Sequence, residues 1–396
     1  MKKLLLVIPE NSYKSNDFVT SAEKLDLDFL VITDSQQVSG QFSDTVIIHS
    51  FNKELENDVR EKLKDVTHIL PVDHSALKFS AYLVDLLNVK GNNTKSINNA
   101  MNKLESRNIF NSISEIKIQN AIVKTIEDIE LFLNENGTSV LKPIYGTASK
   151  SVIKIDSFQE KKAAVEKLMQ DCSDQDLIIE EFVDGSEYAL EGNLINSELK
   201  KIIIFDKPIN YKEPYFEESI YIAPTEIPDE TQKEVVNLIG KACKELGLEN
   251  GPVHVEFKIH KNEIFIIEIN PRMIGGLCSR CLSFGLFKTS LEEIALHAFL
   301  NDELKSIELL SNFVGVLMIP TPASGKFISI NKNELENINN VSGVEITVSE
   351  NSDLLEPPFG DKYLGFVFSQ GKSKEKVMRS LTLAMNLANP IIKKLL

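Results

Sequence analysis

The segment HVEFKIHKNEIFIIEINPR (254–272) constrains the fold most, because it predicts a β-hairpin with carboxylates inside its strands. Apolar and polar residues alternate in both halves, as expected when one face of each strand is buried. A three-residue turn at 261–263 fixes which residues face each other. The predicted pairs are His254 with Asn270, Val255 with Ile269, Glu256 with Glu268, and Phe257 with Ile267.

Two glutamates directly opposite each other destabilise a sheet unless a cation lies between them. Carboxylate oxygens with an amide oxygen nearby suit Mg²⁺, which completes its shell with water and phosphate. The alternative is a hairpin whose polar face is simply solvated. Because Glu256, Glu268 and Asn270 share one face, and Pro271 and Arg272 follow directly, the sequence favours a metal site.

Length and charge narrow the class of protein. The chain has 396 residues, enough for two or three domains at roughly 100–200 residues each. It is 42% hydrophobic and 26% charged, as globular proteins are, and its formal net charge is −15. Nucleic acid and anionic membranes would be repelled, so neither is expected as a partner. Anionic small substrates would need local positive groups.

Targeting and redox signals are sparse. No stretch approaches the ~20 apolar residues of a membrane span. The initial run KKLLLVIPE is ended by Pro9 and Glu10, so it predicts a first strand rather than a signal peptide. Cys278 and Cys281 form a lone CxxC without the neighbours of a zinc site. We expect reduced thiols and a cytoplasmic location.

The order of apolar runs predicts four regions. The first alternates short strands (KLLLVIP, DFLVITD, DTVIIHS, THILPVD) with amphipathic stretches, which indicates a parallel sheet with helical crossovers. A single polar helix, INNAMNKLESRNIF, leads into a second α/β region with a helix near 158–171. A third region holds the hairpin and a long ordered loop at 205–230. The last is β-rich and closed by a C-terminal helix. The regions are 1–95, 96–184, 185–308 and 309–396.

Positive groups precede the hairpin. Lys142 is predicted on a strand, followed by the small-residue loop Gly146–Ser149, whose backbone N–H groups can close over phosphates. The loop matches neither GxxxxGK[ST] nor GxGxxG, and a plain hairpin connection is the alternative. Lys103 and Arg107 lie one helical turn apart; the alternative for them is a solvated helix face.

The segment LIIEEFVDGSEYALEG runs from an apolar strand into acidic residues. A strand edge followed by a carboxylate can hold adenine through the backbone and ribose through Glu187; the alternative is an ordinary edge strand. Arg272, directly after the metal face, has a planar guanidinium that suits phosphate oxygens or a developing oxyanion. A surface salt bridge is the alternative for Arg272.

The order of these features resembles the ATP-grasp superfamily, over nearly the whole chain. The motif VHVEFKI…FIIEINPR is its most specific part. Within the superfamily the chain is most similar to the amino-acid ligase group of carboxylate–amine ligases. The resemblance implies an α/β (α+β) ATP-grasp fold. Its parts would be an N-terminal parallel α/β domain, a mobile lid subdomain, a central antiparallel sheet and a small β-rich C-terminal domain.

The resemblance also implies roles, residue by residue. Arg272 would be catalytic, stabilising the transferred phosphoryl group and the later tetrahedral intermediate. The ATP-binding residues would be Lys103, Lys142, Gly146, Ser149, Glu180, Glu181, Val183 and Glu187. The ligands of one or two Mg²⁺ ions, or of Mn²⁺, would be Glu256, Glu268 and Asn270. Residues next to the substrates would be His254, Gly275, Gly276 and Arg280. Two positions depart from the family pattern: Ser151 replaces a glycine, and His74 an acidic residue.

The implied reaction is phosphoryl transfer from ATP to a carboxylate, followed by attack of an amine on the acyl phosphate with release of ADP and phosphate. The partners would be small-molecule carboxylates and amines, with homodimerisation left open. The segments 146–151 and 205–230 are the expected lids, since an acyl phosphate must be kept from water. An ATP-grasp carboxylase, an ATP-grasp kinase and a non-catalytic nucleotide-binding regulator remain alternatives. No biotin-carrier segment is visible.

Overall fold

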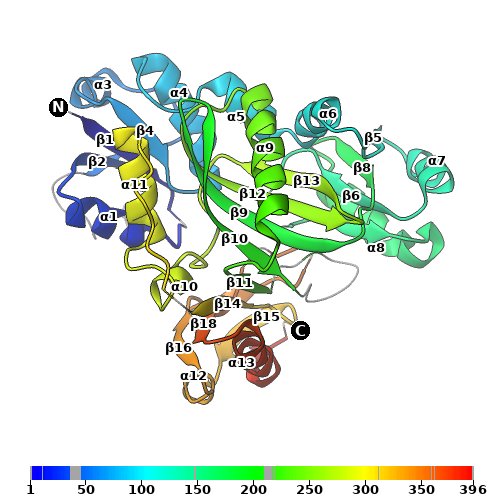
Figure 1. Cartoon of the computed structure of the whole chain (residues 1–396). Coiled ribbons are helices and arrows are strands. Elements are labelled where there is room, and N and C mark those ends of the chain that lie inside the picture. The colour runs from blue at the N-terminus through cyan, green and yellow to red at the C-terminus, as the bar shows by residue number, and fades with distance from the viewer. Residues whose placement is uncertain are drawn as a thin grey trace.

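Figure 1 shows the computed structural model, which describes residues 2–10, 12–35, 46–146, 149–208, 216, 219–310, 312–357, 359–360 and 362–394. In these ranges the strands form an N-terminal sheet, a small antiparallel sheet, a large eight-stranded sheet and a three-stranded C-terminal sheet. No helix of the described part is both long and apolar enough to cross a membrane.

The N-terminal sheet is parallel, with strand order β3-β2-β1-β4. Its strands are β1 (Lys3–Ile8), β2 (Asp28–Thr33), β3 (Val46–Ile48) and β4 (His68–Pro71). The helices around it are α1 (Ser15–Lys24), α3 (Asn57–Lys62), the short 3₁₀ helix η1 (His74–Ala76) and α4 (Leu77–Leu87). The predicted parallel sheet is confirmed. Strands β2 and β3 lie on one side of β1, and β4 lies on its other side. The winding direction of the sheet therefore reverses between β1 and β4.

The predicted single polar helix is two helices. They are α5 (Thr94–Met101) and α6 (Lys103–Ile113). Asn102 interrupts the run with extended backbone angles, and its side-chain oxygen accepts hydrogen bonds from the N–H groups of Leu104 and Glu105 at 3.0 and 3.1 Å. This N-cap satisfies donors that the first turn of a helix otherwise leaves unpaired. It also sets Lys103 at the first position of α6.

Replacing Asn102 by alanine is expected to lower the free energy of unfolding by about 1 kcal/mol, because two N–H donors in the first turn of α6 lose their acceptor. Chemical denaturation would measure this. Ser112→Ala, an exposed change near the other end of the same helix, is the control and should leave stability within about 0.5 kcal/mol of wild type. Equal stability of the two variants would contradict the capping role.

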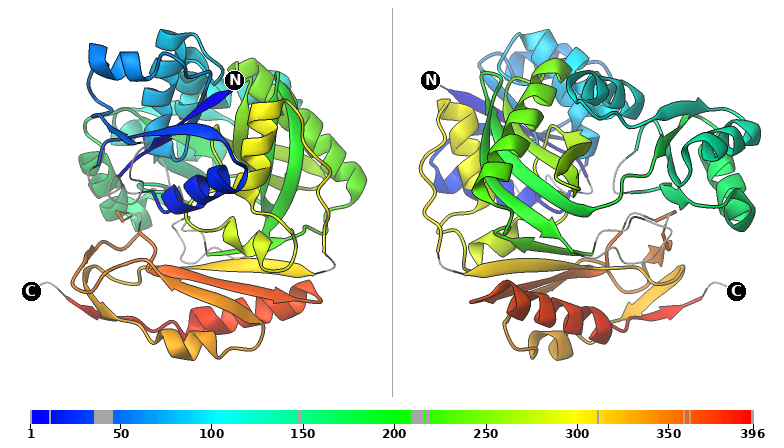
Figure 2. Two further views of the ribbon diagram at one scale, coloured as in Figure 1. Left: turned by 90° about the vertical axis from the view of Figure 1, so that its left-hand side faces the viewer. Right: turned by 45° about the vertical axis from the view of Figure 1, so that its right-hand side comes forward.

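A small antiparallel sheet of order β5-β8-β6-β7 stands out at one side of the molecule (Figure 2). Its strands are β5 (Asn120–Val123), β6 (Ser139–Pro143), β7 (Ile153–Ile155) and β8 (Leu177–Glu181). The helices α7 (Ile126–Asn136) and α8 (Phe158–Asp171) supply apolar side chains to a core shared with these strands. Lys142 therefore lies on a strand, as predicted.

The large sheet is antiparallel throughout, in the order β13-β12-β9-β10-β11-β14-β18-β16. Its first five strands are β9 (Ser186–Ile195), β10 (Glu198–Lys207), β11 (Ile220–Ala223), β12 (Gly251–His260) and β13 (Glu263–Asn270). Helix α9 (Asp229–Leu246) packs with one face of this sheet and α11 (Leu291–Asn301) with the other. The short α10 (Arg280–Ser283) follows β13.

The C-terminal region continues the same sheet. Strands β14 (Phe313–Ile319), β16 (Val341–Ile346) and β18 (Gly365–Gly371) join it through β11. Helices α12 (Lys332–Glu336) and α13 (Lys374–Leu387) cover it below, as Figure 2 shows. The three-stranded sheet consists of β15 (Gly325–Ser329), β17 (Asp353–Leu354) and β19 (Ile391–Lys393). The region is β-rich as predicted, but α13 is followed by β19 rather than closing the chain.

The hairpin of β12 and β13 has the predicted pairs at its functional end. His254 faces Asn270, Val255 faces Ile269 and Glu256 faces Glu268. The turn, however, has two residues, Lys261 and Asn262, both with positive φ. A β-bulge beyond Glu256 then restores the register, and Phe257 faces Ile266. The predicted pairing of Phe257 with Ile267 is wrong, because Ile267 is the extra residue of the bulge.

The expected long loop at 205–230 is also partly wrong. Its first residues end β10, and β11 occupies Ile220–Ala223 as a fully buried strand. Residues 209–215, 217 and 218, where the predicted lid falls, lie outside the described part of the chain.

Candidate active site

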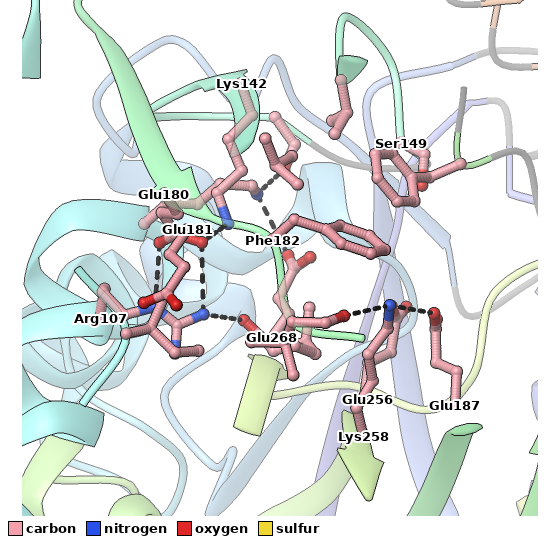
Figure 3. A pocket seen from close by; sticks show the side chains of 18 of the residues that line it. Arg107, Lys142, Ser149, Glu180, Glu181, Phe182, Glu187, Glu256, Lys258 and Glu268 are labelled. Carbon is pink, nitrogen blue, oxygen red and sulfur yellow. Dashed lines mark hydrogen bonds and ion pairs between the residues drawn. The ribbon is translucent and has the colours of Figure 1, made fainter. Parts of the chain in front are cut away.

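One pocket, of about 100 Å³, lies between the small sheet and the hairpin of the large one (Figure 3). Its walls include every described residue that was predicted to bind ATP, and two of the three predicted metal ligands. They are Lys103, Lys142, Gly146, Ser149, Glu180, Glu181, Val183, Glu187, Glu256 and Glu268. The third ligand, Asn270, is buried opposite His254 at the end of β13. Segments more than 150 residues apart in sequence thus meet at one site.

Glu180 orients two cations at the inner end of this pocket. Its carboxylate pairs with Arg107 Nε at 3.0 Å and with Lys142 Nζ at 2.6 Å. Burial alone would raise the pKa of Glu180, but Arg107 and Lys142 outweigh it and lower the pKa to about 2. Glu180 was predicted to bind ATP. It lines the pocket, and its carboxylate is paired with these two protein cations.

Arg107 was noted only as a helix-face charge, yet it connects three elements. Besides Glu180, its NH1 and NH2 donate to the carbonyls of Ile266 and Ile267 at 2.8 and 3.3 Å. These carbonyls flank the bulge in β13. The bulge turns the Ile267 side chain into the pocket wall, beside Val140 and Phe182. The pocket wall therefore combines apolar side chains with charged ones.

Lys103 ties the start of the predicted phosphate loop to the hairpin. Its Nζ donates to the carbonyl of Gly146 at 2.8 Å and pairs with Glu268 at 3.3 Å. Thr147 and Ala148, the middle of that loop, lie outside the described residues. Ser149 and Ser151 have φ of 53° and 58°, a conformation that favours glycine. The family glycine that Ser151 replaces would adopt this backbone without strain.

Two lysines for which no role was predicted line the pocket near Glu187. Lys207, at the end of β10, pairs with Glu187 at 2.5 Å and with Glu256 at 3.3 Å. Lys258 donates to the carbonyl of Val183 at 3.0 Å and lies 3.8 Å from Glu187. Lys258 shares a strand face with Glu256 and could have been found by parity. Lys207 carries no such local signal.

The two opposed glutamates are both ionised. Burial would raise the pKa of each carboxyl, but Lys207, followed by His254, holds the pKa of Glu256 below its usual value. Lys103 does the same for the pKa of Glu268. The described residues contain no cluster of three or more His, Cys, Asp or Glu side chains that could hold a metal. Two carboxylates and the Asn270 amide are nevertheless hard oxygen donors, and they fit Mg²⁺ or Mn²⁺ ions that keep water and phosphate as further ligands.

His254 is fixed as a cation behind this face. Its Nδ1 lies 2.5 Å from Glu191 and its Nε2 3.5 Å from Glu256. Burial disfavours the charged imidazole, but Glu191 and then Glu256 outweigh it and raise the pKa of His254 to about 9. Glu191, also missed from the sequence, accepts a second hydrogen bond from the N–H of Ile274 at 3.0 Å. It thereby positions the segment that follows Arg272.

The remaining predicted residues lie beyond β13. Arg272 is 8% exposed and donates through NH1 to the carbonyl of Met273 at 2.7 Å. Gly275 has open space around it, whereas a Cβ on Gly276 would lie 2.7 Å from Phe366. Arg280 was predicted to lie next to the substrates. Its Nε and NH2 donate to the carboxylate of Asp17, both at 2.9 Å, so its guanidinium joins α10 to α1.

Comparison with known proteins agrees with this geometry. A family model described as the ATP-grasp domain matches residues 135–281, the stretch that supplies both walls of the pocket. The matched segment is similar to an ATP-grasp domain. A crystal structure of an L-amino acid ligase from Bacillus licheniformis superimposes with a TM-score of 0.79 at 22% identity, covering 100% of this chain and 99% of that one. The two chains therefore share one fold.

Two curated relatives of this chain are ligases. It is 27% identical over 257 residues to an alanine--anticapsin ligase of Bacillus amyloliquefaciens, covering 57% of this chain and 54% of that protein. It is 28% identical over 198 residues to a D-alanine--D-alanine ligase of Francisella philomiragia subsp. philomiragia, covering 48% and 63%. The match thus spans about half the length of the first of these relatives.

Proposed function

We propose that the protein is an ATP- and Mg²⁺-dependent carboxylate–amine ligase that joins amino acids and releases ADP and phosphate. The observation that carries the proposal is the pair of ionised carboxylates, Glu256 and Glu268, facing each other in a pocket that also holds Lys103 and Lys142. Arg272 follows two residues after the metal face. Similarity to an L-amino acid ligase and to two amino-acid-joining ligases supports the choice of substrate class.

In this proposal the pocket binds ATP lengthwise. Adenine lies against the apolar side chains of Val140, Phe182 and Ile267. Glu181 and Val183 lie beside it. Glu187 binds the ribose. Lys103 and Lys142 contact the phosphates, and Glu180 keeps Lys142 aimed at them. These cations also supply the local positive charge that an anionic substrate needs on a chain of net charge −15.

Glu256, Glu268 and Asn270 would hold the metal, which when bound neutralises charge on the transferred phosphoryl group. A carboxylate oxygen of the first substrate attacks the terminal phosphorus, and the bond to ADP breaks. The amine nitrogen of the second substrate then attacks the acyl carbon, the bond to phosphate breaks, and the nitrogen loses a proton to solvent. Arg272 stabilises the oxygen that becomes negative in the tetrahedral intermediate. His254, held as an imidazolium, positions Glu256 rather than accepting the amine proton.

Trapping with hydroxylamine tests this chemistry. An acyl phosphate is electrophilic at carbon, so a hydroxamate should form when the enzyme, ATP, Mg²⁺ and the correct carboxylate are mixed with hydroxylamine. A screen of the twenty amino acids as carboxylates, read by hydroxamate colour and by ADP release, would identify that substrate. Adding the correct amine should suppress the hydroxamate and give an amide, detected by mass spectrometry.

The rival activities give different results in the same assay. A kinase would release ADP and give a product inert to hydroxylamine, and a carboxylase would require bicarbonate. Formation of AMP and pyrophosphate would overturn the proposal, because the pocket as described clamps the terminal phosphates.

A further inference from the structure

Lys14 carries a buried ammonium group. It directly precedes α1, is 1% exposed, and its Nζ has no hydrogen-bond partner among the described residues. Taking an ammonium out of water is costly unless it is paired. Burial accordingly lowers the pKa of Lys14. A ligand that carries a negative charge would supply the missing partner.

The position of Lys14 in the fold is one where ligands bind. The winding of the N-terminal sheet reverses between β1 and β4, and ligands of open α/β sheets bind in the crevice at the carboxyl ends of such strands. Lys14 follows the carboxyl end of β1, and His74 follows that of β4. Both are thus placed at the switch point.

Two further buried nitrogens there are unpaired. They are His74 Nδ1 and Arg272 Nε, which have no hydrogen-bond partner within the described ranges. Arg272 acts electrostatically on both Lys14 and His74, so the three groups are neighbours. Burial, followed by the charge of Arg272, lowers the pKa of His74 to about 4, which leaves the ring neutral. Three unpaired nitrogens from three segments therefore converge beside the proposed acyl-transfer centre.

The carboxylates nearest to Lys14 are already engaged by other donors. They belong to Glu292, Asp73 and Glu191. Glu292 accepts from the Ser279 hydroxyl at 2.6 Å, and Asp73 from the His74 N–H at 2.8 Å. Glu191 is bound to His254 and to the N–H of Ile274. None lies within ion-pair distance of the Lys14 ammonium in the described structure.

We propose that Lys14 binds the free carboxylate of the amine substrate, so that the acceptor is an amino acid rather than a simple amine. This inference rests on the proposed function. Lys14 is not part of the nucleotide pocket, and its electrostatic neighbours include Arg272 but not Lys103 or Lys142. The carboxylate that receives the phosphoryl group must lie between the nucleotide and Arg272. When two amino acids are joined through their α-amino and α-carboxyl groups, the α-carboxylate of the acceptor does not react. Lys14 binds this carboxylate.

The test compares acceptors that differ only in this charge. With the donor found by hydroxamate trapping, kcat/KM for amide formation is measured with glycine, L-alanine and L-phenylalanine and with their carboxamides. Wild type should prefer the free acids by about 10- to 100-fold, the range for a hydrogen bond to a charged group. In Lys14→Met this preference should shrink to within about threefold, mainly through a higher KM for the free acids. Lys24→Met is the control, since Lys24 lies on α1 with its side chain 62% exposed, and it should keep the wild-type preference.

Each outcome of this comparison either supports or overturns the role of Lys14. A wild-type enzyme that uses acids and carboxamides equally overturns the inference, and this measurement stands even if Lys14→Met does not fold. A folded Lys14→Met enzyme with the full wild-type preference overturns it as well. In both cases hydroxamate formation by wild type leaves the ligase proposal intact. If wild type gives no hydroxamate with any carboxylate, the ligase proposal fails and the inference falls with it.

Discussion

Glu268→Gln is expected to lower kcat by about 10³-fold or more while leaving the fold intact. The change removes one of two opposed carboxylates from the proposed metal face, which corresponds to several kcal/mol of lost transition-state stabilisation. The glutamine side chain keeps the shape but not the charge, and the site is at the pocket surface, so thermal unfolding should change little. Steady-state ADP release at saturating ATP, measured over a Mg²⁺ titration, checks the effect.

The matched control is Glu263→Gln. Glu263 lies on the same strand β13 but at the turn end of the hairpin, where it is exposed and faces His260. This variant should retain wild-type kcat and Mg²⁺ dependence. The metal assignment would be wrong if Glu268→Gln turned over normally with an unchanged Mg²⁺ requirement.

Glu180→Gln is expected to destabilise the protein by about 3–5 kcal/mol, because it leaves Arg107 and Lys142 buried without their shared carboxylate. Hydrogen exchange should show the loss concentrated in β6, β8 and α6, the elements that this cluster joins. Glu181→Gln, the exposed neighbour on the same strand, should stay within about 0.5 kcal/mol of wild type. Equal exchange protection in the two variants would contradict a structural role for the cluster.

The same variant should change how the free energy of unfolding depends on pH in the acidic range. The pKa of Glu180 is about 2 in the folded protein, against an ordinary value of 4.5 for a glutamate carboxyl, so its carboxylate stabilises the folded state fully above pH 4.5. That contribution, at most roughly 3 kcal/mol for this shift, is lost as pH falls from 4.5 towards 2. The stability difference between wild type and Glu180→Gln should narrow over this window. Denaturation midpoints at pH 6, 4 and 3 would measure it, and a constant difference would refute the low pKa.

The hairpin was predictable because its pairing is local. Strand parity alone places Glu256 against Glu268 once a short turn is assumed. The assumed three-residue turn was wrong, yet the two-residue turn and the bulge together give the same register at the functional end. A bulge leaves no reliable mark in a sequence. Its consequence here, Ile267 turned into the pocket, could be seen only in the structure.

Other parts of the site depend on segments that are distant in sequence. Glu191 and Lys207 lie on β9 and β10 and meet His254 and Glu256 only because β9 pairs with both β10 and β12. No local pattern distinguishes them from ordinary strand charges. The break at Asn102 had a local signal, an asparagine before a helical run. Two asparagines precede it in INNAMN, and the sequence alone does not show which one is the cap.

The continuity of the large sheet means that the catalytic half of the chain would be insoluble on its own. Strand β11 shares a single register pair with β10 but four with β14, and all four of its residues are buried. A chain ending before β14 would leave β11 as a bare apolar edge whose N–H and C=O groups could pair with a strand of another molecule. The C-terminal strands therefore cover the edge of the sheet that carries the pocket. We expect truncation before β14 to cause aggregation before it affects catalysis.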